Sequence, residues 1–174
     1  TLIILKKKDK FIIPFDSLKD GLHEYEFHAD TAFFGNFDYT LIEDADIKAH
    51  VSFEKKPSMF RLQLELDGVV NTVCDRCLDD LQISIEGEQE FVVKITEKTI
   101  DEDDHIISLS PNDQELDLTH VIYESIHLLM PIKVDHENIE DCNPEVIAQL
   151  DEINSSDEDE EEQDPRWDAL KNIK

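Results

Sequence analysis

Apolar and polar residues alternate over much of the first two-thirds of the chain. The clearest run places apolar side chains at every second position over residues 45–53, and a second run does the same over residues 60–66. A period of two is typical of a strand that buries one face. The intervening Glu-Lys-Lys-Pro-Ser contains turn-forming residues, so the two runs predict an antiparallel hairpin.

Glycines and further alternating runs predict more strands on both sides of this hairpin. The Asp20-Gly21 and Asp67-Gly68 dipeptides predict turns, and Gly87 predicts a break between alternating runs at residues 81–85 and 91–95. A short strand is predicted at residues 106–109, within an acidic loop that is rich in turn signals.

From Asp117 onward the spacing becomes helical. Apolar residues recur three or four positions apart as far as Leu129, and Pro131 ends the pattern. A second helix is predicted after Asn143, because an asparagine cap followed by Pro144 is a typical helix start. The predicted fold class is α+β: a mainly antiparallel β part, as a twisted sheet or partly open barrel, followed by C-terminal helices and an acidic disordered segment.

Three parts are predicted along the chain. Residues 1–150 form a single mainly-β domain with a C-terminal helical part. Residues 151–163 form an acidic disordered linker, because such a stretch buries too little apolar surface to offset its ordering entropy. Residues 164–174 form a short amphipathic tail helix, with Trp167, Leu170 and Ile173 on one side.

The net charge is -27, and the acidic residues are concentrated near the C-terminus. Residues 135–164 contain 14 acidic side chains and neither Lys nor Arg, whereas the last ten residues carry a net charge of +2. Binding to nucleic acid through general attraction to phosphates needs clustered Lys and Arg. The field of this chain instead attracts basic partners, such as ribosomal proteins or basic peptides.

The chain lacks the sequence features of a membrane or secreted protein. No apolar run approaches the roughly 18 residues of a membrane span. The N-terminal apolar stretch is four residues long and precedes its lysines, which is the wrong length and order for a secretory signal. An odd number of cysteines, three, argues against a disulfide framework. We therefore expect a cytoplasmic protein with no membrane partner, and the absence of phosphate-loop and hydrolase motifs predicts no small-molecule substrate.

Cys74 and Cys77 form a C-x-x-C at the bend between two predicted strands. A thioredoxin-type pair opens a helix, whereas a period-two run follows here, and the acidic neighbours disfavour thiolate formation. A zinc site needs two more ligands, and the one remaining cysteine, Cys142, follows His136 by six positions. Cys74, Cys77, His136 and Cys142 are therefore the candidate metal ligands, with zinc as the candidate cofactor. Packing of small buried residues is the alternative.

The chain resembles the bacterial YceD family at three places. "CDRCLDDLQISIEGEQEFVVKITE" is similar to a C-x-R-C-L element between strands, "LLMPIKVDHENIEDCNPEV" to a proline followed by a His- or Cys-bearing loop, and "DPRWDALKNIK" to the closing tail. The resemblance covers roughly residues 45–174. Many members carry a cysteine-rich C-G-L-C-P-x-C-G element late in the chain, where this chain has only His136 and Cys142. The resemblance implies a non-enzymatic role in large-subunit ribosomal RNA accumulation, and hence in ribosome assembly.

Two kinds of partner are open for such a factor. Precursor ribosomal RNA would contact a basic patch, at Lys6, Lys7, Lys8 and Lys10 or at Lys55, Lys56 and Arg61. A basic large-subunit ribosomal protein would bind the acidic 135–164 segment, and the charge distribution favours this partner. The candidate binding residues are Arg76 and the acidic run Asp157, Glu158, Asp159, Glu160, Glu161 and Glu162. The alternatives are a C-x-x-C thiol redox enzyme and a zinc-stabilised protein-interaction module unrelated to ribosomes.

Overall fold

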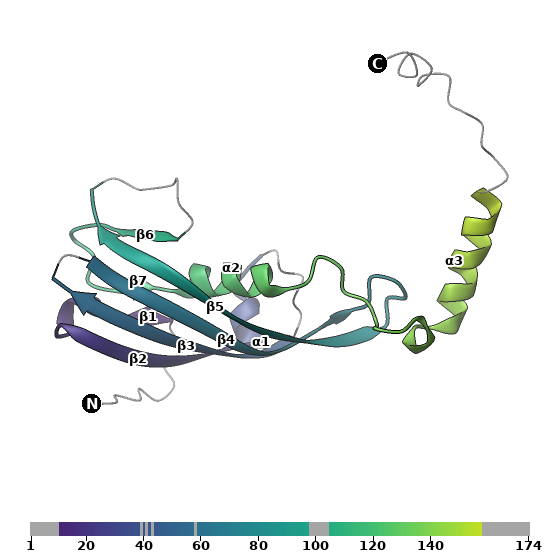
Figure 1. Cartoon of the computed structure of the whole chain (residues 1–174), viewed down its shortest axis with the longest axis horizontal. Coiled ribbons are helices and arrows are strands. Elements are labelled where there is room, and N and C mark those ends of the chain that lie inside the picture. The colour runs from purple at the N-terminus through teal and green to yellow at the C-terminus, as the bar shows by residue number, and fades with distance from the viewer. Residues whose placement is uncertain are drawn as a thin grey trace, which may run out of the picture.

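A five-stranded sheet forms the body of the protein (Figure 1). Its strands lie in the order β2 (Gly21–Asp30), β3 (Asp44–Lys56), β4 (Met59–Val73), β5 (Asp80–Ile95) and β6 (Ile106–Leu109). All neighbours are antiparallel except β5 and β6, which are parallel. This computed structural model describes residues 11–38, 40, 42, 44–57, 59–97 and 105–157. Over these residues the predicted α+β class is confirmed, and the sheet is open rather than closed into a barrel.

Shorter elements lie against the sheet and beyond its end. Strand β1 (Ile12–Ile13) pairs with β7 (Leu116–Asp117), and the 3-10 turn η1 (Phe15–Ser17) follows β1. The helices are α1 (Thr31–Phe34), α2 (Thr119–Leu129) and α3 (Pro144–Asp157), and the 3-10 turn η2 (Ile139–Asp141) precedes α3. The change from strand to helix near Asp117 is therefore confirmed, as is the end of the helix before Pro131.

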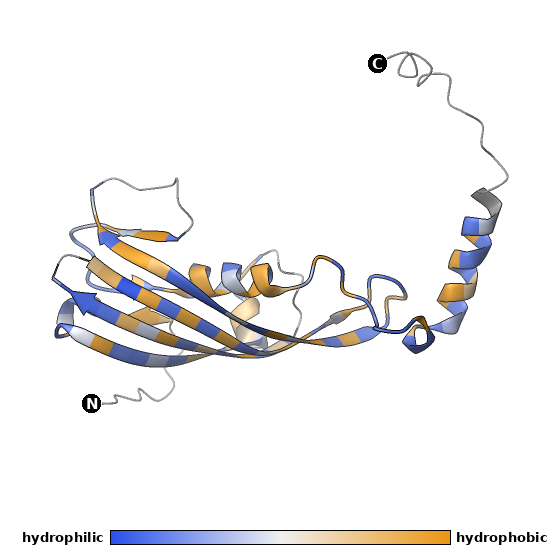
Figure 2. Ribbon diagram, viewed as in Figure 1, coloured by the Kyte–Doolittle hydropathy of each residue, from blue (hydrophilic) through white to orange (hydrophobic). Residues whose placement is uncertain are grey.

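The core lies on one face of the sheet. Alternate side chains of β3 and β4 are buried, as the period of two requires, and they pack against apolar residues of α1 and α2. The members of β3 and β4 that are at least nine-tenths buried on this face are Ala45, Ile47, Ala49, Val51, Phe53, Phe60, Leu62, Leu64, Leu66 and Val70. The intervening positions are polar, so hydropathy alternates along each strand (Figure 2). The opposite face of the sheet is left open to solvent.

Two glycines that predict interruptions in fact lie inside continuous strands. Gly68 is within β4, and a side-chain Cβ there would lie 2.2 Å from the backbone oxygen of Asp46. Gly87 is within β5, where a Cβ would lie 2.4 Å from a methyl carbon of Leu129. The predicted turn and break are therefore wrong. Glycine is required at both positions by close packing, of β3 on β4 and of α2 on β5, rather than by a turn.

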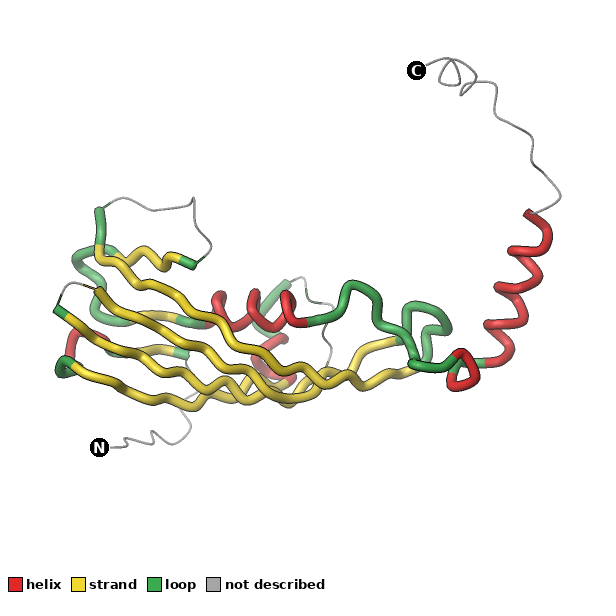
Figure 3. The backbone as a smooth tube through the Cα atoms, in the orientation of Figure 1, coloured by secondary structure: helices red, strands yellow, loops and turns green. Residues whose placement is uncertain are grey.

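Helix α3 projects away from the sheet at the end opposite β6 (Figures 1 and 3). It begins as predicted, because the Asn143 side chain accepts a hydrogen bond from the backbone N–H of Glu145 at 3.1 Å. The disordered linker was expected to begin at residue 151, whereas the helix continues to Asp157. No helix breaker occurs between Pro144 and Asp157, so the helix extends through the start of the acidic stretch. The remainder of the predicted linker and the predicted tail helix, residues 158–174, lie outside the described residues.

Among the described residues, no helix has the length and apolar character needed to cross a membrane.

Candidate metal centre

The C-x-x-C lies in a tight connection between β4 and β5. Strand β4 ends at Val73 and β5 begins at Asp80, so the two cysteines are at a bend between strands, as predicted. The backbone N–H of Cys74 donates to the oxygen of Asp79 at 2.8 Å, and that of Leu78 donates to the oxygen of Cys74 at 2.8 Å. Leu78 closes the turn with a φ of 62°. These bonds hold both thiols on one side of a compact turn, residues 74–79, which we call the knuckle.

A second segment reaches this knuckle from the loop after α2. The backbone N–H of Asp75 donates to the oxygen of Val134 at 2.7 Å. In return, the N–H of Val134 donates to the carboxylate of Asp75 at 2.7 Å. This reciprocal pair positions His136, two residues further along the chain. Cys142 follows directly after η2, whose last bond runs from the N–H of Cys142 to the oxygen of Ile139 at 3.1 Å.

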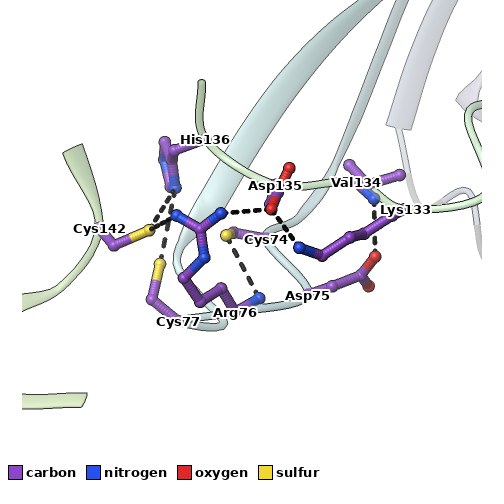
Figure 4. Close-up of polar contacts among 9 residues, drawn as sticks. All are labelled: Cys74, Asp75, Arg76, Cys77, Lys133, Val134, Asp135, His136 and Cys142. Atoms are coloured by element: carbon purple, nitrogen blue, oxygen red, sulfur yellow. Dashed lines mark hydrogen bonds and ion pairs between the residues drawn. The ribbon is translucent and has the colours of Figure 1, made fainter. Parts of the chain in front are cut away.

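The four predicted ligands converge although they come from segments 59 residues apart. The sulfur atoms of Cys74, Cys77 and Cys142 and a ring nitrogen of His136 all lie within 4.8 Å of one another (Figure 4). Nδ1 of His136 is 3.6 Å from the Sγ atoms of both Cys77 and Cys142. In a tetrahedral zinc site, with bonds of about 2.3 Å to sulfur and about 2.0 Å to nitrogen, these atoms are about 3.5 Å apart. The donor set and its spacing therefore fit zinc.

A charged group lies directly behind the ligands. Nη1 of Arg76 lies 3.4 Å from Sγ of Cys142, and Nη2 of the same guanidinium pairs with the carboxylate of Asp135. Lys133 pairs with the same carboxylate oxygen of Asp135, at 2.6 Å. The hydrogen bond from Lys133, with a further contribution from the charge of Arg76, holds the pKa of Asp135 below its ordinary value against the effect of burial. Such outer groups orient metal ligands and offset the excess negative charge of thiolates.

The environment of Cys74 favours its thiolate. Burial raises the pKa of this thiol, but hydrogen bonds from the backbone N–H groups of Cys77, His136 and Arg76 outweigh burial and lower the pKa to about 6. The sequence predicted the opposite, because the acidic residues Asp75, Asp79 and Asp80 lie close to the cysteines in the chain. In the structure the Asp75 carboxylate is instead bonded to the N–H of Val134. Burial raises the pKa of Cys142, and its contact with Cys77 adds to this effect.

A small apolar cluster surrounds the thiols and is separate from the core of the sheet. The three cysteines are at least 96% buried, and Leu81, Val146 and Ile147 pack against them. Val146 and Ile147 belong to the first turn of α3, so the cysteines connect that helix to the sheet. We refer to the knuckle (74–79), the loop (132–143) and the first turn of α3 (144–147) as the Cys–His module.

The other predicted binding residues have different surroundings. Arg76 is half-buried and bonded within the module, so its guanidinium is not an open contact point. Asp157 is the last residue of α3, and residues 158–162 lie outside the described part of the chain. In the proposed basic patch, Nζ of Lys55 donates to the backbone oxygens of Phe15 and Leu18, at 2.8 and 2.9 Å.

The second lysine of that patch is also engaged, because Lys56 pairs with Glu54 at 2.7 Å. Arg61 is exposed on the open face of the sheet. The other predicted patch, at Lys6, Lys7, Lys8 and Lys10, lies outside the described residues. Two of the three basic side chains of this patch, Lys55 and Lys56, are therefore engaged in contacts within the chain.

Sequence reasoning missed the groups that support the ligands. Asp135 and Lys133 precede His136 in "KVDHE", and Asp75 lies inside the C-x-x-C. Their positions in the sequence next to the ligands were the one sign of a supporting role. Their partners could not be predicted, because the loop and the knuckle are far apart in the sequence and meet only in the fold.

Residues 62–174 match the family model described as "Large ribosomal RNA subunit accumulation protein YceD". The match includes all four candidate ligands, most of β4, strands β5 and β6, and α3. No curated protein and no solved structure matches the chain.

Proposed function

The chain belongs to the YceD family of large ribosomal RNA subunit accumulation proteins, and we propose that it is a non-enzymatic assembly factor whose Cys–His module is held together by zinc. Membership of the family implies a role in the accumulation of large-subunit ribosomal RNA. The observation that carries the proposal is the convergence of three buried thiols and one imidazole within 4.8 Å. A cytoplasmic location is part of the proposal, since ribosome assembly takes place there in bacteria.

Zinc at this site would have a structural rather than a catalytic role. Structural zinc sites use four protein ligands and leave no position open, and Cys74, Cys77, His136 and Cys142 supply four. When bound, the ion would connect the knuckle to the segment that leads into α3. The thiol redox alternative is disfavoured, because Cys74 is fully buried and strand β5, not a helix, follows the motif.

We further propose that the partner is a basic ribosomal protein of the large subunit. The open face of the sheet is predominantly acidic, which supports this choice over RNA. A depression on this face is lined by five carboxylates, Glu26, Glu65, Asp67, Glu86 and Glu88, together with Lys48, His50, Leu66 and Gly87. Helix α3 contains no Lys or Arg. Phosphates would be repelled by these surfaces, whereas Lys- and Arg-rich protein segments would be attracted.

The binding experiment compares two probes at two salt concentrations. The probes are the protein fraction extracted from purified large ribosomal subunits and the ribosomal RNA from the same subunits. We expect the full chain to retain basic proteins from the first probe, less so at high salt, and to retain little RNA. Replacing the acidic run 157–162 with Asn and Gln should slow association without changing the fold. Strong RNA binding with no protein retention would contradict the proposal.

A further inference from the structure

Exposed large apolar side chains are concentrated around the Cys–His module. Nine are exposed among the described residues, and two of them, Leu22 and Ile95, lie on the sheet away from the module. The other seven belong to the module or to the residues that lead into and out of it: Val73, Leu78, Leu128, Ile132, Ile139, Leu150 and Ile153. In a chain of net charge -27, such a concentration is typical of a surface that contacts another molecule.

Leu78 is the clearest member of this set. It is 73% exposed, and it is the residue of the described chain, glycines apart, that has a positive φ, 62°. A glycine or asparagine adopts this conformation at lower cost, and an exposed leucine gains no burial in return. Neither the metal ligands nor the core needs a leucine side chain at this point. Leu78 follows Cys77 directly in the C-x-R-C-L element, so the module holds it at a defined position.

Helix α3 extends the same apolar surface outward. Val146 and Ile147 pack on the cysteines, and Leu150 and Ile153 follow at the spacing that keeps them on one side of the helix. Leu150 is 37% exposed and Ile153 is 58% exposed. The helix projects beyond the sheet, so no other element of the described chain covers these residues (Figures 1 and 2). The apolar stripe is therefore available to a partner.

The charges around these apolar residues indicate what kind of partner binds them. Exposed carboxylates surround the module at Asp79, Glu137, Glu140, Asp141 and Glu145. Its two basic side chains, Arg76 and Lys133, both pair with Asp135. A second copy of the chain would bring like charges together, and RNA would be repelled for the same reason. The complementary partner has an apolar pocket or groove with Lys and Arg at its rim.

We propose that Leu78 and the α3 stripe, Leu150 and Ile153, form the docking surface for the basic large-subunit protein. This inference rests on the proposed function and names the surface that performs it. Leu78 inserts into an apolar pocket, α3 lies along an adjoining groove, and the surrounding carboxylates pair with basic residues at the rim. Few side chains carry most of the energy of such an interface, and central apolar anchors are among them.

The experiment uses the full chain and the protein fraction of purified large ribosomal subunits as the probe. The variants are Leu78→Gly, Leu78→Asn and the double variant Leu150→Gln/Ile153→Gln. Leu22→Gln is the matched control, since Leu22 is 63% exposed on β2, away from the module. Retention of each identified basic protein is titrated, and zinc content, Tm and sedimentation are measured on the same samples.

We expect each variant of the docking surface, at Leu78 or at Leu150 and Ile153, to lower the affinity for the retained basic protein by about tenfold or more, while Leu22→Gln matches the wild type. Leu78→Gly and Leu78→Asn should keep their zinc and have an unchanged or higher Tm, because both residues suit a positive φ. Unchanged affinity in these variants would overturn the inference and leave the proposed function standing. A wild-type dimer that the substitutions convert to a monomer would also overturn the inference, because a second copy of the chain would then occupy this surface. A wild type that retains no basic protein would contradict the proposed function itself.

Discussion

Replacing Cys142 with serine tests whether a metal connects the two segments of the Cys–His module. Serine preserves the size of the side chain but is a poor zinc ligand, so the change removes a ligand with little change in packing. The thiol of Cys142 lies within 4.8 Å of the other three ligand atoms and is 96% buried. We expect the variant to lose the connection between the knuckle and the 132–143 loop and to keep the sheet.

The size of the effect follows from the loop that the site closes. Cys77 and His136 are 59 residues apart in the chain. A cross-link that closes a fully unfolded loop of this length stabilises the folded state by about 4 kcal/mol in the chain-entropy treatment. This is an upper bound for opening of the module, because β5 and α2, which lie between the two ligands, stay folded. Since about 1.4 kcal/mol corresponds to a factor of ten, its loss increases opening of the module by up to about a thousandfold. The core of the sheet is a separate cluster, so this effect should remain local.

Hydrogen exchange followed by mass spectrometry measures this opening directly. The backbone N–H groups of Asp75 and Val134 report on it, because each bonds across the junction at 2.7 Å. In Cys142→Ser, peptides containing these amides should exchange far faster, while peptides from β3 and β4 should not change. His50→Asn is the control, because it replaces a histidine that lies on the open face of the sheet and is not a candidate ligand. Equal protection of Asp75 and Val134 in wild type and Cys142→Ser would refute the reasoning.

Three further predictions concern the fold and the support of the site. Gly68→Ala should lower the Tm by several degrees, because the new Cβ would meet backbone atoms of β3. Gly35→Ala is the control and should be nearly neutral, since its Cβ would lie 3.5 Å from the nearest atom, the backbone oxygen of Thr31. A similar Tm for the two variants would contradict this prediction. Hydrogen bonds from the side chains of Thr31 and Asn71 hold the pKa of Asp44 below its usual 3.8, so its contribution to stability is present above that pH and is lost as the pH falls through the lower folded value. NMR titration should therefore show a higher Asp44 pKa in Thr31→Val, and an unchanged pKa would count against this cause. Arg76→Lys should weaken zinc binding by about tenfold in a chelator competition, because one amine cannot contact both Cys142 and the carboxylate of Asp135 as the guanidinium does. Equal zinc affinity in the two proteins would show that these contacts are dispensable.

Much of the sheet could be predicted because its alternation reflects burial on one face. The hairpin of β3 and β4 and the short strand β6 were read directly from apolar spacing, and Asn143 gave the start of α3. Gly68 and Gly87 could not be read in this way. A glycine that admits a neighbouring strand or helix has the same local signature as one that makes a turn, and only the tertiary contact distinguishes them.

The identities of the candidate ligands were predictable, but their surroundings were not. Three thiols and the histidine nearest the third left few other combinations. The low pKa of Cys74 depends on backbone N–H groups that become oriented only in the folded knuckle. The pairing of Arg76 with Asp135, and of Asp75 with Val134, joins segments that are remote in the sequence. The exposure of Leu78 is likewise a property of the folded turn.

Elemental analysis of the full chain, purified without chelator, tests the central claim most directly. The account predicts one zinc ion per chain in the wild type and in His50→Asn, and little or none in Cys74→Ser and Cys142→Ser. Hydrogen exchange on the same samples gives the protection of the Asp75 and Val134 amides. A wild-type protein that contains no metal, yet protects both amides as strongly as the core of the sheet, would contradict the account.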